Sequence, residues 1–303
     1  MEVDCIEKSD SKRNGKRSPS ESIAQRIQQS FVVLNDMSQY VSLLLTIIRR
    51  EQQLRKNDYK ILVFFPASRL ARFFHQFFTL GDACSGSAAA NNDPADNLWE
   101  IHSRMSQSSR ARASNSFRNA RRGVLFSSDV SARGLDYPDI TLVVQLGAPA
   151  SMQDYTHRIG RTGRAGQAGK CILVLLPFEN QMKDIICGKE SIEEDRELSM
   201  WLRGDGDEGF SSKFPSLLEI CQDDLESTLM KIKSGHKSLT PSAEAAYKAF
   251  LVHYASKGTS SKGKKSSDTA PSGILEYAAG FANATGLAGV PELDATVASR
   301  IGL

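Results

Sequence analysis

The sequence predicts an α/β fold, a doubly wound parallel sheet followed by an all-helical C-terminal extension. Short continuous apolar runs alternate with amphipathic helices over residues 25–180, as in parallel sheets that are covered on both faces. After Pro177 the apolar residues recur mainly at helical spacing. The chain has 303 residues, of which 40% are hydrophobic, and can therefore build one large or two modest domains around a sizeable core.

The expected elements of the sheet domain follow in regular order. We expect strands at residues 31–34, 60–65, 98–102, 123–127, 140–146 and 171–176. We expect helices at residues 37–55, 68–79, 107–120 and 151–158. Ser151 and Asp154 have the spacing of a capping box and so mark the start of the last helix. Residues 1–24 are expected to be a disordered lead-in, and residues 81–97 a surface-loop insertion, because both stretches are polar.

Residues 181–303 are expected to form the helical extension. Its helices are expected at residues 181–187, 190–202 and 216–233, followed by one with Thr240 as N-cap and Pro241 at its first helical position. One face of that helix is aromatic and apolar, and we interpret it as core: Tyr247, Phe250, Leu251 and Tyr254. A Lys, Ser and Gly linker at residues 256–272 leads to two short final helices.

Charge and cysteine usage narrow the class of protein. The 38 basic and 35 acidic residues give a net charge of only +3. Between positions 100 and 170, however, the sequence has ten arginines and only five acidic residues. This local excess suits a phosphate backbone. The five cysteines form no CxxC pair and have no histidine at ligand spacing, so we expect reduced thiols, an intracellular location of unresolved compartment and no metal site. No apolar run is long enough to indicate a membrane role.

Residues 157–166, His-Arg-Ile-Gly-Arg-Thr-Gly-Arg-Ala-Gly, are the most informative stretch. Arginines recur every third residue between glycines, and each guanidinium can hold phosphate oxygens bidentately. The alternative is a basic loop with glycines for turns. The stretch resembles motif VI of the superfamily 2 helicases, and His157 at its head points to the DEAD-box branch. The resemblance implies that Arg161 and Arg164 are arginine fingers that contact ATP, and that His157 links the motif to the catalytic machinery of an opposing domain.

Residues 128–136, Ser-Asp-Val-Ser-Ala-Arg-Gly-Leu-Asp, directly follow an expected strand and resemble motif V of the same family. The resemblance implies that the hydroxyl of Ser128 bonds an RNA phosphate and that the carboxylate of Asp136 lies by the ATP ribose. Gly134 lets the turn between them close and is counted with the RNA-binding residues. The family usually has Thr where Ser128 stands, and the hydroxyl is kept. The alternative is a strand-end turn with structural aspartates.

Residues 102–110 resemble a third stretch of these helicases, His-Gly followed by Gln-x-x-Arg. Gln107 and Arg110 lie one turn apart at an expected helix start, where free N–H groups favour an anion, and the resemblance implies RNA binding. Ser103 replaces the family's usual Gly. For Arg110 the alternative is an intrahelical or surface ion pair. Arg69, after the strand in the place of motif IV, is a weaker candidate.

The resemblance covers about residues 25–180 and implies the second, C-terminal RecA-like domain of a DEAD-box ATP-dependent RNA helicase. The extension looks like that of the mitochondrial-type fungal helicases and their plant relatives. The phosphate loop, the Asp-Glu-Ala-Asp box and the Ser-Ala-Thr motif are absent from the sequence. A Gly-rich stretch at residues 258–264 has Lys265 where a phosphate loop needs Ser or Thr. We therefore expect ATP with Mg²⁺ to be bound mainly by a first RecA-like domain, in cis or in trans.

Two functions remain open at this stage. The first is an ATP-dependent RNA helicase, present here as a half-enzyme, a gene fragment or a truncated sequence that is inactive by itself. The alternative is a non-catalytic RNA-binding or regulatory module derived from a helicase. A superfamily 2 DNA helicase fits less well, because the stretches around His157 and Ser128 follow the DEAD-box pattern.

Overall fold

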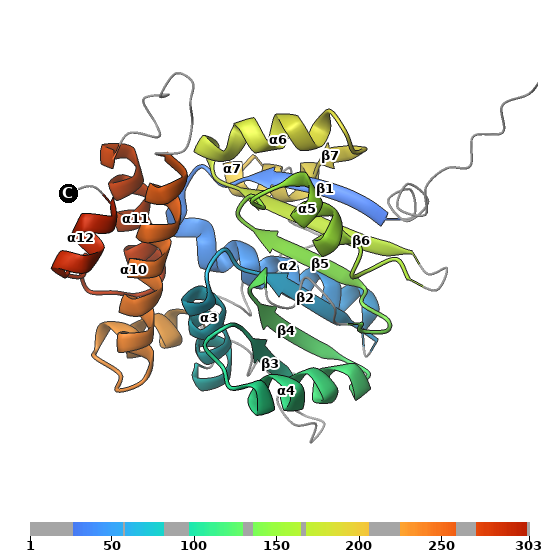
Figure 1. The fold of residues 1–303 in the computed structure, drawn as a ribbon, viewed down its shortest axis with the longest axis horizontal. Coiled ribbons are helices and arrows are strands. Elements are labelled where there is room, and N and C mark those ends of the chain that lie inside the picture. Colours follow the sequence, from blue (N-terminus) through green and yellow to red (C-terminus); the bar gives the residue numbers. More distant parts are fainter. Residues whose placement is uncertain are drawn as a thin grey trace, which may run out of the picture.

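Seven parallel strands form one sheet in the part of the chain that the structure, a computed structural model, describes (Figure 1). The described residues are 27–56, 58–81, 97–129, 136–164, 168–205, 225–258 and 271–301. The strand order is β3-β4-β2-β5-β6-β1-β7. The strands are β1 (Ile27–Val33), β2 (Lys60–Phe64), β3 (Leu98–Ile101), β4 (Gly123–Ser127), β5 (Leu142–Leu146), β6 (Gly169–Leu175) and β7 (Ile192–Glu194).

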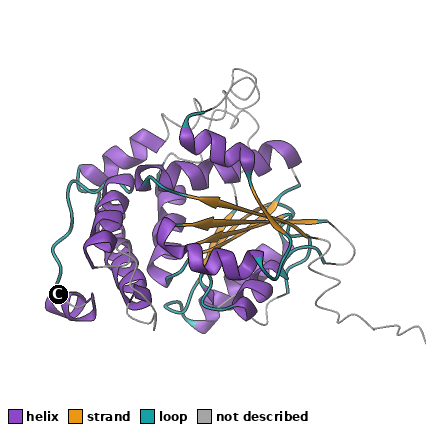
Figure 2. Ribbon diagram, turned by 90° about the horizontal axis from the view of Figure 1, so that it is seen from above, coloured by secondary structure: helices purple, strands orange, loops and turns teal. Residues whose placement is uncertain are grey.

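Alternation of side chains along the strands builds a core on each face of the sheet. In β2, Leu62 and Phe64 belong to one apolar cluster, and Ile61 and Val63 belong to the other. Because both faces are apolar, both must be covered, and Figure 2 shows helices on the two sides of the strands. The helices of this part are α2 (Tyr40–Arg55), α3 (Ser68–Leu80), α4 (Gln107–Asn119), α5 (Met152–Ile159), α6 (Asn180–Cys187) and α7 (Arg196–Arg203). The doubly wound architecture expected from the sequence is confirmed.

The C-terminal helices α10 (Leu239–Gly258), α11 (Pro271–Ala284) and α12 (Ala295–Ile301) share a core with the sheet. Phe250 of α10 stacks on Phe281 of α11, with ring centroids 4.8 Å apart, and Phe281 meets Tyr40 of α2 edge-on at 5.3 Å. The four side chains expected to face the core are buried, at most 2% exposed. In Figure 2 the strand arrowheads point toward these helices, so the extension lies beyond the carboxyl ends of the strands.

Three elements differ from the expectations. The helix expected over residues 190–202 is wrong in its first part, because residues 192–194 form β7 beside β1 and the helix α7 begins only at Arg196. The first strand starts at Ile27, four residues earlier than expected. Thr240 does not cap α10. The helix begins at Leu239, and the Thr240 hydroxyl donates to the carbonyl of Ile232 at 2.8 Å.

Some expectations fall outside the described residues. They are the lead-in at 1–24, most of the surface insertion at 81–97, Gly134, the first part of the helix expected at 216–233, and most of the linker at 256–272 with its Gly-rich stretch. No helix among the described residues is long and apolar enough to cross a membrane.

Candidate nucleotide and nucleic-acid site

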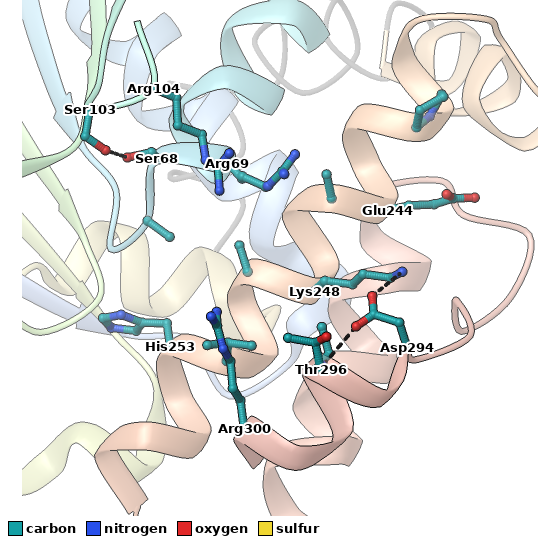
Figure 3. A pocket seen from close by; sticks show the side chains of 16 residues that line it. Ser68, Arg69, Ser103, Arg104, Glu244, Lys248, His253, Asp294, Thr296 and Arg300 are labelled. Atoms are coloured by element: carbon teal, nitrogen blue, oxygen red, sulfur yellow. Dashed lines mark hydrogen bonds and ion pairs between the residues drawn. The ribbon is translucent and has the colours of Figure 1, made fainter.

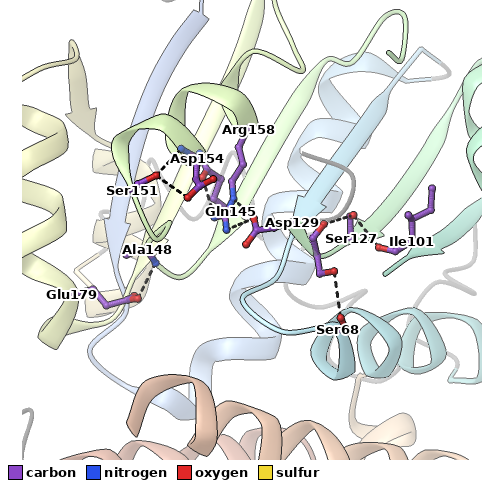
Figure 4. Close-up of polar contacts among 11 residues, drawn as sticks. Ser68, Ile101, Ser127, Asp129, Gln145, Ala148, Ser151, Asp154, Arg158 and Glu179 are labelled. Carbon is purple, nitrogen blue, oxygen red and sulfur yellow. Dashed lines mark hydrogen bonds and ion pairs between the residues drawn. The ribbon is translucent and has the colours of Figure 1, made fainter. Parts of the chain in front are cut away.

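Helix α5 carries the arginine-rich stretch and starts as the sequence predicts. The Ser151 hydroxyl accepts from the Asp154 N–H at 3.1 Å and donates to the Asp154 carboxylate at 2.7 Å. This cap fixes the start of α5 just after β5. The helix then runs back along the sheet and places Arg158 over the face of the sheet that carries Phe64. Figure 4 shows the cap beside the contacts of Arg158.

Arg158 is buried, with only 2% of its surface exposed. Its Nε and one terminal nitrogen lie 2.8 and 2.6 Å from the Asp129 carboxylate, and the other terminal nitrogen donates to Gln145 Oε1 at 3.3 Å (Figure 4). The guanidinium also lies over the ring of Phe64, 5.4 Å from its centroid. Arg158 therefore joins the start of the 128–136 stretch to α5 and is not positioned to meet a ligand.

Arg161 and Arg164 leave the end of α5 on a tight turn. Arg161 Nε donates to the carbonyl of His157 at 3.1 Å, and Arg164 Nε donates to that of Gly160 at 2.8 Å. Gly163 makes the turn with φ +69°, in the left-handed region that glycine occupies without strain. Burial and the neighbouring Arg164 lower the pKa of Arg161. The two side chains thus present positive charge from a fixed backbone.

Asp136 is the carboxylate that meets these arginines. Its side chain forms an ion pair with Arg164, and both groups are partly solvent-exposed. The Thr162 hydroxyl donates to the carbonyl of Ile140, which precedes β5. Two stretches that are separated in sequence, 136–141 and 157–164, therefore meet next to the starts of β5 and β6.

This placement differs from the usual one. Ligand loops of open α/β sheets usually follow the carboxyl ends of the strands. Because α5 begins at the carboxyl end of β5 and runs antiparallel to it, Arg161 and Arg164 come out at the amino end. His157 lies on the last turn of α5, and its buried Nδ1 has no hydrogen-bond partner among the described residues.

A second polar site does lie at the carboxyl ends. The Ser128 hydroxyl, after β4, is 3.5 Å from the Ser68 hydroxyl, which follows β2 and is itself 2.8 Å from the hydroxyl of Ser103, after β3. Three adjacent strands thus bring three hydroxyls together. Sequence reasoning identified Ser128 and treated Ser103 as a departure from the family, but it did not identify Ser68. The only sequence signal for Ser68 was its place at the start of the helix that follows the buried strand β2.

Gln107 and Arg110 lie on the first turn of α4, as expected. Ser106 caps this helix, since its hydroxyl accepts from the N–H of Ser109 at 3.1 Å. Gln107 is exposed, and Arg110 is half-buried with an Nε that has no hydrogen-bond partner among the described residues. The first turn of α4 therefore offers N–H groups and a cation close to the loop that carries Ser103.

A pocket of about 820 Å³ continues this carboxyl-end site toward α10 and α12 (Figure 3). Four of its lining residues are basic: Arg69, Arg104, Lys248 and Arg300. Burial and the nearby Arg104 lower the pKa of Arg69. Lys248 also pairs with the carboxylate of Asp294 at 3.3 Å. Sequence reasoning named only Arg69 in this group, because the other three come from distant segments that only the fold brings together.

The described residues contain no group of three or more His, Cys, Asp or Glu side chains that could hold a metal ion. Of the described cysteines, Cys171 is buried and unpaired, and Cys187 is exposed and unpaired. Burial raises the pKa of the Cys171 thiol to about 12, so this thiol stays protonated.

The chain is similar in sequence to known proteins. The family model described as the helicase conserved C-terminal domain matches residues 39–166. DEAD-box ATP-dependent RNA helicase 31 of Arabidopsis thaliana is 31% identical over 92% of this chain and 32% of its own length. DEAD-box ATP-dependent RNA helicase 26 of Oryza sativa subsp. japonica is 35% identical over 68% of this chain and 33% of its own length. The mitochondrial ATP-dependent RNA helicase MSS116 of Phaeosphaeria nodorum is 36% identical over 51% of this chain and 26% of its own length.

The fold has a counterpart among solved structures. A structure of Mss116p, with its NTE and C-tail deleted and bound to ssRNA and AMP-PNP, has a TM-score of 0.63 and 20% identity, and covers 92% of this chain and 48% of that chain. The likeness extends over the helical extension as well as the sheet, and the expected RecA-like fold is confirmed. The chain spans about a third of the length of the curated relatives, 32% and 33% in the two plant proteins.

Proposed function

We propose that this chain, a homologue of the DEAD-box ATP-dependent RNA helicases that carries a helicase conserved C-terminal domain, acts as the second motor domain of an ATP-dependent RNA helicase. The observation that carries the proposal is the presence of two polar sites on one sheet. Arg161, Arg164 and Asp136 lie at the amino ends of the strands, and the hydroxyls of Ser128 and Ser68 lie at the carboxyl ends. One site suits a nucleotide and the other suits a nucleic-acid backbone.

At the nucleotide site, Arg161 and Arg164 neutralise charge that develops on the phosphoryl group during hydrolysis, and Asp136 receives the ribose. An arginine finger of this kind raises the rate by about 10³ to 10⁵. Because Arg164 already pairs with Asp136, it must exchange that carboxylate for phosphate oxygens when ATP binds. His157 passes the interaction on to the opposing domain; within the described part of the chain its Nδ1 makes no hydrogen bond.

At the nucleic-acid site, Ser128, Gln107 and Arg110 hold RNA phosphates and sugars, together with Gly134, which lies outside the described residues. Such contacts carry little sequence information, so the proposed activity is not specific for one RNA sequence. The basic pocket beside α10 and α12 lies next to Ser68 and Ser103 and extends this positively charged surface. Closure of two domains on ATP and RNA together would bend one strand and unpair a short duplex.

The proposal requires a first RecA-like domain, in cis or in trans. That domain supplies the phosphate loop and the main ligands of Mg²⁺, which reduces the charge repulsion of the phosphates when bound. The residues of this chain contribute the arginines, Asp136 and the RNA contacts. An intracellular location of unresolved compartment is part of the proposal, because the five cysteines of the sequence form no CxxC pair.

RNA-stimulated ATP hydrolysis tests the proposal. It is measured for this chain alone and for a mixture with the first domain of a DEAD-box relative. We expect negligible turnover from the chain alone, turnover in the mixture, and a loss of about 10³-fold or more in kcat for Arg161→Ala and for Arg164→Ala. Arg121→Ala is the matched control, because Arg121 is exposed and forms a surface ion pair, at 3.6 Å, with the exposed carboxylate of Asp58.

The result also separates the two candidate functions. Binding of RNA without ATP turnover in any mixture would support a non-catalytic RNA-binding module and contradict the helicase. Strong ATP hydrolysis by the chain alone would contradict the need for a first domain.

A further inference from the structure

Lys60 is a buried cation that none of the proposed contacts with ATP or RNA uses. It is the first residue of β2 and is only 2% exposed. Lysine is rarely buried unless its ammonium group is fully satisfied, because desolvation of the charge is costly. Burial lowers the pKa of Lys60, and the nearby Asp139 opposes that effect. The contacts of the Lys60 ammonium group must therefore compensate for its burial.

The contacts of the Lys60 ammonium lie on two segments. Nζ donates to the carbonyl of Arg118 at 3.0 Å and to the carbonyl of Pro138 at 3.3 Å, and it lies 5.3 Å from the centroid of the Phe117 ring. Arg118 is in the last turn of α4, where carbonyls lack intrahelical partners and a cation is favoured. Lys60 thus caps α4 and fastens Pro138 to it.

Pro138 belongs to the segment that carries Asp136, and a second bond holds the same segment. Arg118 Nε donates to the carbonyl of Asp136 at 3.1 Å. Tyr137, between these two residues, packs edge-on against Phe117 at 5.0 Å. Two carbonyls on either side of Tyr137 are therefore held by cations of β2 and α4.

The backbone of this segment needs such support. Asp139 has φ +60°, in the left-handed region that non-glycine residues seldom occupy. Beyond it, Thr141 exchanges hydrogen bonds with the Lys60 backbone, including N–H to carbonyl at 2.9 Å. The chain between Asp136 and β5 thus takes a defined, unusual path that Lys60 holds from its side chain and from its backbone.

From these contacts we infer that Lys60 is a positioning residue for nucleotide binding. It holds the segment of residues 136–141 so that the Asp136 carboxylate faces the turn of Arg161 and Arg164, and Arg118 assists it. The inference rests on the proposed nucleotide site. It adds two residues that lie outside the arginine-rich stretch and touch neither phosphate nor ribose.

Lys60→Met tests the inference, because methionine keeps the apolar stem and removes the ammonium group. Hydrogen–deuterium exchange on the 303-residue chain alone should show the segment 136–141 exchanging about tenfold faster, as expected when bonds to a charged group are lost. In the two-domain ATPase mixture, KM for ATP should rise about tenfold and kcat should stay within about twofold, because the ribose contact is made equally in the ground and transition states.

Two further variants make the test decisive. Arg118→Gln changes an exposed side chain that does not threaten folding, and it should raise KM for ATP in the same direction. Lys170→Met is the control, because the Lys170 side chain pairs with Glu51 at 3.7 Å and only its backbone N–H, which the substitution keeps, reaches the segment, at the Thr141 carbonyl. It should leave exchange of residues 136–141 and KM unchanged.

The inference is overturned if Lys60→Met exchanges in this segment as Lys170→Met does. It is also overturned if Lys60→Met merely lowers Tm while Arg118→Gln leaves KM unchanged. If no mixture hydrolyses ATP, the proposed function fails, and the exchange experiment still decides whether Lys60 holds the segment.

Discussion

At the scale of single residues, three arginines of one motif have different surroundings. Arg158 is buried against Asp129 and Gln145, whereas Arg161 and Arg164 lie on the turn that follows α5. We expect Arg158→Ala to lower the free energy of unfolding by about 2 to 3 kcal/mol, because Gln145 loses a charged partner inside the core. Urea denaturation of the isolated chain measures this change.

Arg161→Ala is the comparison for that measurement. It should change the free energy of unfolding by less than about 1 kcal/mol. Arg161 is only half-buried, and its Nε donates to the carbonyl of His157, which lies in the last turn of α5. Equal destabilisation by both variants would contradict the division between a structural arginine and two ligand-facing ones.

At the scale of elements, the contact between α11 and the turn that precedes α2 depends on a glycine. A Cβ added at Gly280 would lie 2.7 Å from the Cβ of Met37. In an open helix, Ala in place of Gly stabilises by about 1 kcal/mol. Here we expect Gly280→Ala to destabilise by about 1 to 3 kcal/mol, because the collision with a buried side chain outweighs the gain in helix propensity. Thermal unfolding gives the sign.

Gly289→Ala provides the matched control. Apart from its chain neighbours, no described residue has an atom within 4 Å of the Cβ that would be added there, so its effect on Tm should be small. A rise in Tm for Gly280→Ala would mean that α11 can move away from Met37 at little cost, and that the close approach is not needed.

At the scale of the whole molecule, one face of the sheet and the extension share one apolar cluster. It contains Val63 of β2, Phe74 of α3 and Phe250 of α10 without interruption. We therefore expect one cooperative unfolding transition, in which amides of α10 and of β2 become exposed at the same denaturant concentration. Hydrogen exchange at increasing urea checks this. Earlier exchange of α10 to α12 as a group would show that the extension unfolds independently.

The sequence predicts this architecture well where the pattern is local. The continuous apolar run at Lys60 to Phe65 predicts a central strand, and the helical spacing of Tyr247, Phe250 and Tyr254 predicts a core face rather than a base-stacking surface; both predictions are confirmed. Strand β7 was missed because its three residues contain only one apolar side chain, Ile192, and its pairing with β1 decides its conformation. Local propensity cannot report a pairing partner such as Gln29, which lies 163 residues before Ile192.

The candidate sites divide in the same way. Motif spacing pointed to Arg161, Arg164 and Asp136, which the fold brings to one turn. It could not show that α5 carries them to the amino ends of the strands, because this depends on the direction of the helix. The basic pocket combines Arg69 with Arg300 from opposite ends of the chain, and no window of sequence contains both.

Helix α4 joins the two proposed ligand sites through its length. Its first turn carries Gln107 and Arg110, and Arg118 in its last turn, roughly 15 Å away, holds the carbonyl of Asp136. If a ligand at one end favours a particular position of α4, the contacts at the other end shift with the helix, and the two affinities become interdependent. If RNA raises the affinity for ATP by some factor through α4, thermodynamic reciprocity requires ATP to raise the affinity for RNA by the same factor. The heterotropic coupling of such a motor would then reside in a single helix of thirteen residues.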